Sequence, residues 1–235
     1  MLTIRKSEER GHADHGWLDS YHSFSFAQYY DPAHMNYSVL RVINEDVIAP
    51  GGGFGMHPHR DMEIITYMLS GELAHKDSLG NGSKIKRGDV QRMSAGTGIV
   101  HSEFNASVQE AYLLQIWLLP ERNGIAPGYE EKHFSEESKH NRWCLIASPD
   151  RADGSLLIHQ NVKLLATVLD AGKNLSYSLT EARTAYLQIA QGSLHVNGKK
   201  VNAGDAVMID SETQIEILAD TDAEILLFDL PVTKH

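Results

Sequence analysis

Short runs of β-branched, aromatic and aliphatic residues recur along the chain, and Gly, Asn, Asp or Pro separate them. The runs begin roughly every 8–12 residues, a spacing typical of β-sandwiches and β-barrels. Helical patterns are short and confined to residues 7–10 and 134–141. The sequence therefore predicts an all-β protein. The runs expected to form strands are residues 37–42, 63–69, 112–119, 184–190, 193–196 and 224–229.

The order "strand, Gly-x-Leu, hairpin, Gly-Asp, strand" occurs twice. Gly71-Glu72-Leu73 precedes Gly88-Asp89 in the first copy, and Gly192-Ser193-Leu194 precedes Gly204-Asp205 in the second. Asn197-Gly198 in the second copy favours a two-residue hairpin turn. An internal repeat of this kind predicts two tandem jelly-roll barrels. The predicted division is a first barrel over residues 1–130, a connecting segment over 131–160 and a second barrel over 161–235.

Composition places the chain among soluble globular proteins, with 235 residues, 42% hydrophobic and 22% charged. The net charge of −10 and the lack of a basic stripe argue against direct nucleic-acid binding. No run approaches the ~18 apolar residues of a membrane span, and the start of the chain lacks the apolar core of a signal peptide. The single cysteine, Cys144, rules out an internal disulfide and is expected to be an inert thiol. We expect a cytoplasmic protein with no membrane partner.

Two short motifs in the first half carry the candidate chemistry, His57-Pro58-His59 and His101-Ser102-Glu103. On an extended strand, residues i and i+2 point to the same face. Facing each other, the motifs would bring three imidazoles and one carboxylate together. Such a set suits Fe(II), Ni(II), Cu(II), Mn(II) or Zn(II), whereas Ca and Mg prefer oxygen ligands alone. The second half contains neither motif, so a metal site is expected only in the first barrel.

The identity of the fourth ligand has alternatives. Glu103 is favoured because it follows His101 by two residues, while Glu63 is a rival four residues after His59. The glutamate that does not bind would serve as a base or as a hydrogen-bond acceptor. Asn105 and His75 are weaker candidates.

The segment from Gly51 to Glu63 resembles the first cupin motif, and the segment from Gly88 to Asn105 resembles the second. More specifically, HPHRDMEIITYMLSGELAHKDSLGN, MSAGTGIVHSEFN and the opening RGHADHGWLDSYHSFSFAQYYDP resemble the pirin family of bicupins. Two departures from the general cupin pattern are themselves pirin-like: Ser94 replaces the usual proline, and four residues separate Gly96 from His101. The resemblance covers residues 1–231 and is weaker in the second half.

The resemblance implies a bicupin, that is two tandem cupin (jelly-roll) barrels, with a metal only in the first. The implied ligands are His57, His59, His101 and Glu103, with Glu63 outside the ligand set. The metal is commonly iron, so Fe(II) is expected, with Cu, Ni, Mn, Co or Zn as alternatives. Several relatives are assigned quercetin 2,3-dioxygenase activity, which predicts a flavonol-like aromatic substrate, O₂ as co-substrate, and Glu103 or Glu63 as the catalytic carboxylate.

Other functions stay open at this point. The same centre would serve a cupin enzyme that acts on another small molecule, or a non-enzymatic, redox-responsive regulatory protein of the pirin type. A purely structural metal is disfavoured, because structural zinc sites prefer thiolates in closed shells. The residues expected to line a substrate pocket are Phe54, Met56, Phe104 and Ile65, although core packing is the commoner role for such side chains.

Overall fold

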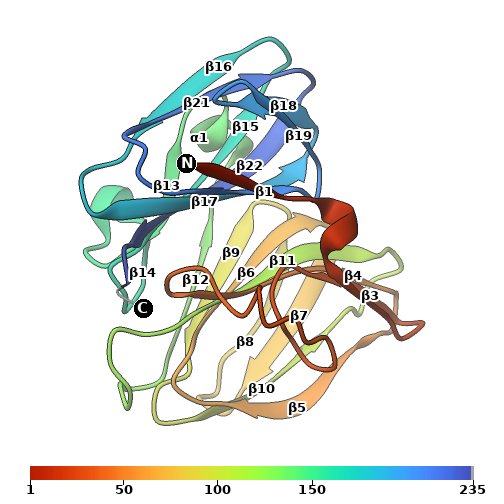
Figure 1. Ribbon diagram of the computed structural model, residues 1–235. Helices are drawn as coiled ribbons and strands as arrows, with labels where there is room; N and C mark the ends of the chain where they lie inside the picture. The colour runs from red at the N-terminus through yellow and green to blue at the C-terminus, as the bar shows by residue number, and fades with distance from the viewer. Residues whose placement is uncertain (234–235) are drawn as a thin grey trace.

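The two halves of the chain fold in the same way, each into one seven-stranded and one four-stranded sheet. The neighbouring strands named below pair antiparallel, except that β13 and β14 in the second half pair in parallel. The computed structural model describes residues 1–233; residues 234 and 235, the end of the predicted second barrel, lie outside the described part. In Figure 1 the first barrel is the lower body and the second barrel the upper one. The predicted all-β bicupin fold is confirmed.

The first barrel pairs a large sheet, which faces the second barrel, with a small sheet at the far side. The large sheet has the order β12 (Gly128–His133), β9 (Asp89–Ser94), β6 (Glu63–Ser70), β11 (Ala111–Leu118), β4 (Leu40–Ile48), β3 (Leu18–His22) and β2 (Gly11–Asp14). The small sheet has the order β5 (Gly53–His59), β10 (Ile99–Phe104), β7 (Glu72–Asp77) and β8 (Gly82–Lys86).

The second barrel repeats this plan. Its large sheet has the order β1 (Leu2–Arg5), β20 (Ala206–Ile209), β17 (Arg183–Gln191), β22 (Ala223–Pro231), β15 (Lys163–Leu169), β13 (Cys144–Ser148) and β14 (Leu156–Leu157). Its small sheet has the order β16 (Asn174–Ser178), β21 (Gln214–Ala219), β18 (Ser193–Val196) and β19 (Lys199–Asn202).

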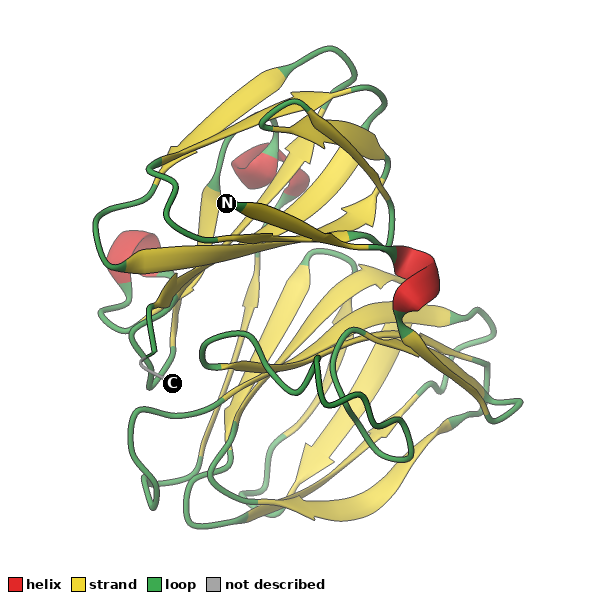
Figure 2. Ribbon diagram, in the orientation of Figure 1, coloured by secondary structure: helices red, strands yellow, loops and turns green. Residues whose placement is uncertain are grey.

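Helices are few and short, as Figure 2 shows. They are the 3-10 helices η1 (Ser7–Glu9) and η2 (Ala152–Gly154) and the α-helix α1 (Glu136–Lys139). Two of them fall where the sequence predicted helical turns. None of the described helices has the length and hydrophobicity needed to span a lipid bilayer.

The predicted internal repeat is real in three dimensions. Gly71 and Gly192 both adopt positive φ, at 70° and 83°. A Cβ atom on either would lie 2.2 Å from the backbone oxygen of the residue just before β11, Glu110, or just before β22, Asp222. Only glycine tolerates that conformation and that approach. Asp89 and Asp205 also match, because each accepts a hydrogen bond from the backbone N–H three residues earlier, at 2.9 Å and 3.0 Å.

The predicted division of the chain differs from the structure at two places. Strand β1 pairs with β20 through Leu2↔Ile209 and so belongs to the second barrel, although it lies within residues 1–130. The apolar side chains of Leu2 and Ile4 pack on the second core, which explains the crossing. In addition, β13 and β14 lie inside the predicted connecting segment but complete the second large sheet. The chain therefore begins in the upper barrel of Figure 1 before it builds the lower one.

The two large sheets face each other, and strand alternation divides their residues between two environments. On β6, Ile65, Tyr67 and Leu69 belong to a core shared by both halves of the chain. Ile64 and Met68 point the other way, into the first barrel. Because side chains alternate along a strand, every residue of β6 is assigned to one side or the other. This alternation decides which polar residues can reach the candidate site.

Candidate metal centre

The four predicted ligands come from two neighbouring strands of the first small sheet. His57 and His59 lie on β5, and His101 lies opposite His57 on β10. Pro58 sits between the two β5 histidines, at a position that lacks an N–H donor. Strand β5 is the edge of its sheet, where a proline is tolerated because one side of the strand needs no ladder hydrogen bonds.

A β-bulge in β5 aims its side chains. His57 pairs with His101 but Phe54 pairs with Glu103, so two residues of β5 oppose the single residue Ser102. A bulge of this kind shifts the alternation by one residue. Phe54 and His57 therefore both line the interior cavity although they are three residues apart, and their ring centroids lie 6.1 Å from each other.

The three imidazoles converge as predicted. The ring centroids of His57 and His101 lie 4.3 Å apart, and those of His59 lie 4.8 Å and 4.9 Å from them. One donor atom from each ring falls within 4.8 Å of the others. His57 Nδ1 lies 2.7 Å from the Gly55 carbonyl, which can only accept, so Nδ1 carries the proton and Nε2 offers its lone pair.

The protonation states also fit a metal site. Burial, assisted by the charge of the neighbouring histidines, lowers the pKa of His59 to about 4 and the pKa of His101 to about 3. Both rings are therefore neutral near pH 7, which is the form that binds metals. Neither nitrogen of the buried His101 ring has a hydrogen-bond partner in the described chain. A divalent transition metal would satisfy such an orphaned buried donor, and the donor set fits one.

The fourth predicted ligand, Glu103, lies next to the three rings but is held from the other side of the barrel. Gln115 Nε2 on β11 donates to its carboxylate at 3.1 Å, and Thr66 Oγ1 on β6 donates at 3.4 Å. Burial raises its pKa to about 7. Its oxygens form a second, overlapping group with His75 and His101, within 4.8 Å. His101 belongs to both groups, so Glu103 lies next to the three-histidine group.

The two weaker candidates have different fates. Asn105 is structural, because its amide donates to the carbonyls of Ile48 and Gln109 at 2.9 Å and 2.7 Å. His75 is buried behind His101, with ring centroids 5.4 Å apart, and Asp77 lies 3.2 Å from its Nε2. His75 therefore backs the centre and does not face the cavity.

The predicted catalytic role of Glu63 does not fit this geometry. Glu63 shares the face of β6 that carries Ile65 and points toward the second barrel. Its carboxylate accepts from the backbone N–H of His159 at 3.1 Å and lies 3.4 Å from His159 Nδ1. It is completely buried there and does not line the cavity. On a single strand, residues four apart would point to the same face. Glu63 instead begins β6, whereas His59 ends β5, and the Glu63 side chain lies on the face of β6 that points away from the cavity.

The histidines open into an interior cavity of about 930 Å³. Small-molecule sites commonly measure roughly 300–1,000 Å³. Its aromatic walls come from Trp17, Phe26, Tyr29, Phe54 and Trp117. Of the predicted pocket residues, only Phe54 lines the cavity; Ile65 lies in the shared core, and Met56 and Phe104 are exposed.

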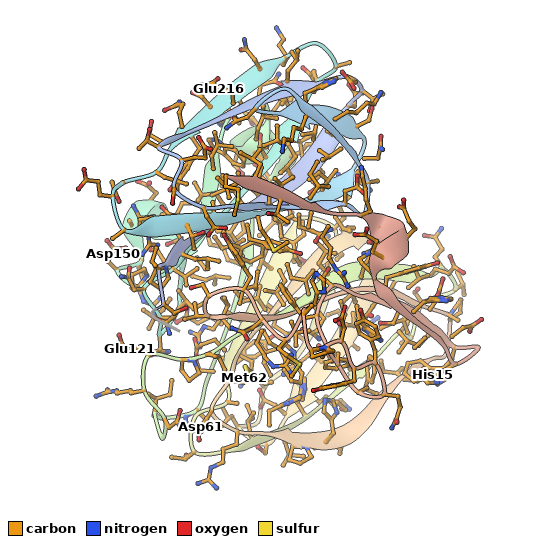
Figure 3. All side chains as sticks on the ribbon, in the orientation of Figure 1. His15, Asp61, Met62, Glu121, Asp150 and Glu216 are labelled. Carbon is orange, nitrogen blue, oxygen red and sulfur yellow. The ribbon has the colours of Figure 1, made fainter. Side chains whose placement is uncertain are left out.

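Sequence reasoning missed a group of polar residues in the cavity wall. Ser20 and His22 on β3 lie opposite Asp46 and Asn44 on β4, and all four are buried. A usable signal was present: Val42, Asn44, Asp46 and Ile48 alternate on one face, but the predicted strand ended at residue 42. Figure 3 labels His15 at the right edge of the lower body and Met62 and Asp61 on its left side.

The chain is similar to known proteins along nearly its whole length. The family model "Pirin" matches residues 3–118, and "Quercetinase C-terminal cupin domain" matches residues 145–230. The chain is 49% identical to the quercetin 2,3-dioxygenase of Escherichia coli K12 over 98% of this chain and 99% of that one. It is 44% identical to a pirin-like protein of Caulobacter vibrioides, over 97% and 99%. The structure of E. coli pirin YhhW in complex with nickel(II) matches with a TM-score of 0.94 and 49% identity, over 99% and 100%.

Proposed function

The chain belongs to the pirin family, and from that premise we propose that it is a metal-dependent dioxygenase of the quercetin 2,3-dioxygenase type. In this proposal O₂ opens the central ring of a flavonol at a mononuclear centre. The proposed ligands are His57, His59, His101 and Glu103. The observation that carries the proposal is the convergence of three imidazoles, two of them kept neutral by burial, at the wall of an aromatic-lined cavity.

Several features of the chain support binding and orientation of a flat substrate. Trp117 packs edge-on against His59, with centroids 4.9 Å apart, and Phe26 packs edge-on against Trp117 at 5.4 Å. These rings offer planar apolar walls directly beside the histidines. A bound metal would supply Lewis-acid polarisation of the flavonol oxygens and electron transfer to O₂.

Glu103 is the proposed acceptor of the substrate's 3-hydroxyl proton, which would move to one of its carboxylate oxygens. It lines the cavity next to the histidines, and a carboxylate oxygen that does not bind the metal can accept a proton there. Gln115 holds one oxygen of the carboxylate in place, so its orientation is set before substrate enters. With Glu63 facing the other barrel, Glu103 is the sole proposed catalytic carboxylate.

We propose Fe(II) as the native metal, with Cu, Ni, Mn, Co and Zn as the competing identities. Three imidazoles and one carboxylate bind all of these ions, so the ligand set alone does not choose between them. The nickel complex of the E. coli relative supports a divalent transition metal in this kind of site. Elemental analysis of protein purified without a chelator or a histidine tag identifies the ion.

The test is turnover by protein loaded separately with Fe(II), Cu(II), Ni(II) and Mn(II). Quercetin should be consumed together with O₂, with release of the depside and CO. His57→Ala should abolish turnover, whereas His195→Ala, which changes a half-exposed histidine of the second barrel, should not. Absence of turnover with every metal, in protein shown to be loaded, would overturn the proposal.

A further inference from the structure

Four buried polar side chains form a patch in the wall of the cavity. Ser20 pairs with Asp46, and His22 pairs with Asn44, on the adjacent strands β3 and β4. Each is at most 4% exposed, and each lines the cavity. Their neighbours on the same face, Leu18 and Ile48, belong to an apolar core cluster. Polar groups in such a place need partners, because burial without a hydrogen bond is costly.

The internal hydrogen bonds of the patch use four of its seven side-chain polar atoms. The Ser20 hydroxyl donates to Asp46 Oδ1, and His22 Nδ1 donates to Asn44 Oδ1 at 2.9 Å. Asp46 Oδ2, His22 Nε2 and Asn44 Nδ2 have no hydrogen-bond partner among residues 1–233, and these residues line the cavity. The patch therefore presents two acceptors and one donor to whatever occupies the cavity.

The charge of the patch limits its ligand. No Lys or Arg among residues 1–233 lines the cavity, and the carboxylates of Asp46 and Glu103 repel each other. Burial raises the pKa of Asp46 to about 7. An anionic ligand group placed at the patch would meet the like charge of Asp46, and a cation would lose its hydration in an aromatic cavity. A neutral hydroxyl, which both donates and accepts, complements the three free atoms.

The patch lies beside the metal centre. Asn44 pairs with Gln115 across β4 and β11, and Gln115 donates to Glu103. A flat ligand of linked aromatic rings that reaches Glu103 therefore also lies against the patch.

We propose that Asp46, with Asn44 and His22 beside it, binds a second hydroxyl of the substrate, apart from the hydroxyl that meets the metal centre. Ser20 positions the Asp46 carboxylate. The ligand class is a neutral aromatic molecule with at least two hydroxyl groups. This inference deepens the proposed function and rests on it for the identity of the flavonol, but the binding it describes does not require turnover.

The experiment compares quercetin with 3-hydroxyflavone, which has a hydroxyl only on the reacting ring. Binding is measured on metal-free protein through quenching of the fluorescence of Trp17 and Trp117, which line the cavity. Wild type should bind quercetin at least about tenfold more tightly, because a hydrogen bond to a charged group contributes that much or more. Asp46→Asn should remove about tenfold of the affinity for quercetin and leave 3-hydroxyflavone within about twofold.

Ser20→Ala should produce a smaller loss for quercetin alone, since the carboxylate stays but is less well held. Glu216→Gln is the charge control, because Glu216 is exposed on the second barrel, far from the cavity (Figure 3). If Asp46→Asn does not fold, the wild-type preference and Ser20→Ala still test the proposal. Equal binding of both flavonols by wild type, or equal loss of both in the variants, would overturn it.

Steady-state kinetics on metal-loaded protein separates the two proposals. Asp46→Asn should raise KM for quercetin with a smaller change in kcat. Hydroxyl-dependent binding without turnover in wild type would refute the dioxygenase proposal alone. Turnover with binding that does not depend on Asp46 would refute the hydroxyl-binding role alone.

Discussion

The two barrels share a plan but differ in what fills them. In both small sheets the second strand contributes alternating inward residues: Ile99, His101 and Glu103 on β10, and Ile215, Ile217 and Ala219 on β21. The second interior is closed by a continuous apolar cluster. The first interior is divided between two smaller apolar clusters and the cavity that holds the histidines and the polar patch.

The difference shows which parts of the repeat belong to the fold and which belong to the site. The turns that shape both barrels carry the same residues, as Gly71 and Gly192 do, because a backbone approach admits no side chain. The inward positions of β10 and β21 differ between the two barrels. The second barrel has apolar residues at these positions, whereas the first barrel has His101 and Glu103, two of the predicted metal-binding residues. We infer that the second barrel mainly stabilises the molecule.

The largest expected effect comes from His101→Ala, which removes the most buried imidazole of the centre. Metal affinity should fall by at least ~100-fold, since loss of even an outer partner of a ligand costs roughly 10–100-fold. The far-UV circular dichroism should not change, because His101 makes no side-chain hydrogen bond. Elemental analysis measures the loss, with His195→Ala as the matched control. Wholesale unfolding of His101→Ala would favour a structural metal.

The opposite result is expected for Ile217→Ala in the second barrel. Ile217 is 1% exposed, and truncation of such a residue costs about 2–5 kcal/mol of unfolding free energy. Denaturant titration measures that cost, and the metal content per folded chain should stay the same. A drop in metal content at temperatures where the variant is fully folded would show that the barrels are not divided in this way.

A pH dependence should be visible in metal binding and should trace to Glu103. Its carboxyl is protonated below its pKa of about 7, so a metal that uses it must displace a proton. Affinity should therefore fall as pH falls below 7, with Glu103 contributing about tenfold per pH unit. Above pH 7 this contribution should level off.

The comparison with Glu103→Gln isolates that contribution. The slope of log affinity against pH between 5 and 7 should decrease by one proton in the variant. Competition with a chelator of known affinity measures both slopes. Identical slopes would mean that Glu103 does not bind the metal as a carboxylate.

The smallest effect is expected for Glu63→Gln, at the junction of the barrels. The substitution weakens the hydrogen bond from the His159 backbone N–H, at a cost of about 1 kcal/mol. The kcat per bound metal should equal that of wild type, because Glu63 does not reach the cavity. A loss of kcat of tenfold or more would contradict this account and would show that Glu63 takes part in catalysis.

Much of the fold and the core of the site could be predicted from the sequence. Strand runs, the repeated glycines and the spacing of His57, His59 and His101 depend on local chemistry that is visible along the chain. The pairing of β1 with β20 of the second barrel could not be predicted, because the pattern of a four-residue strand does not indicate which distant strand it pairs with. The position of Glu63 could not be predicted for a related reason: its separation of four residues from His59 does not indicate on which face of β6 its side chain lies.

The polar patch could not be predicted from the sequence, because its residues lie on two strands whose pairing is not visible along the chain. Asn44 and Asp46 continue the alternation of a buried strand, but only the pairing with β3 brings them to Ser20 and His22. Buried polar residues at inward positions of two strands are a signal of a binding wall once register is known. Register itself is set by long-range packing.

Anomalous diffraction from crystals of the untagged protein, measured on both sides of the absorption edges of iron, nickel, copper, manganese, cobalt and zinc, tests the central claim most directly. We predict a single peak per chain, within bonding distance of His57, His59, His101 and Glu103, with the edge of iron. A peak in the second barrel, or no peak in metal-loaded protein, would contradict the claim.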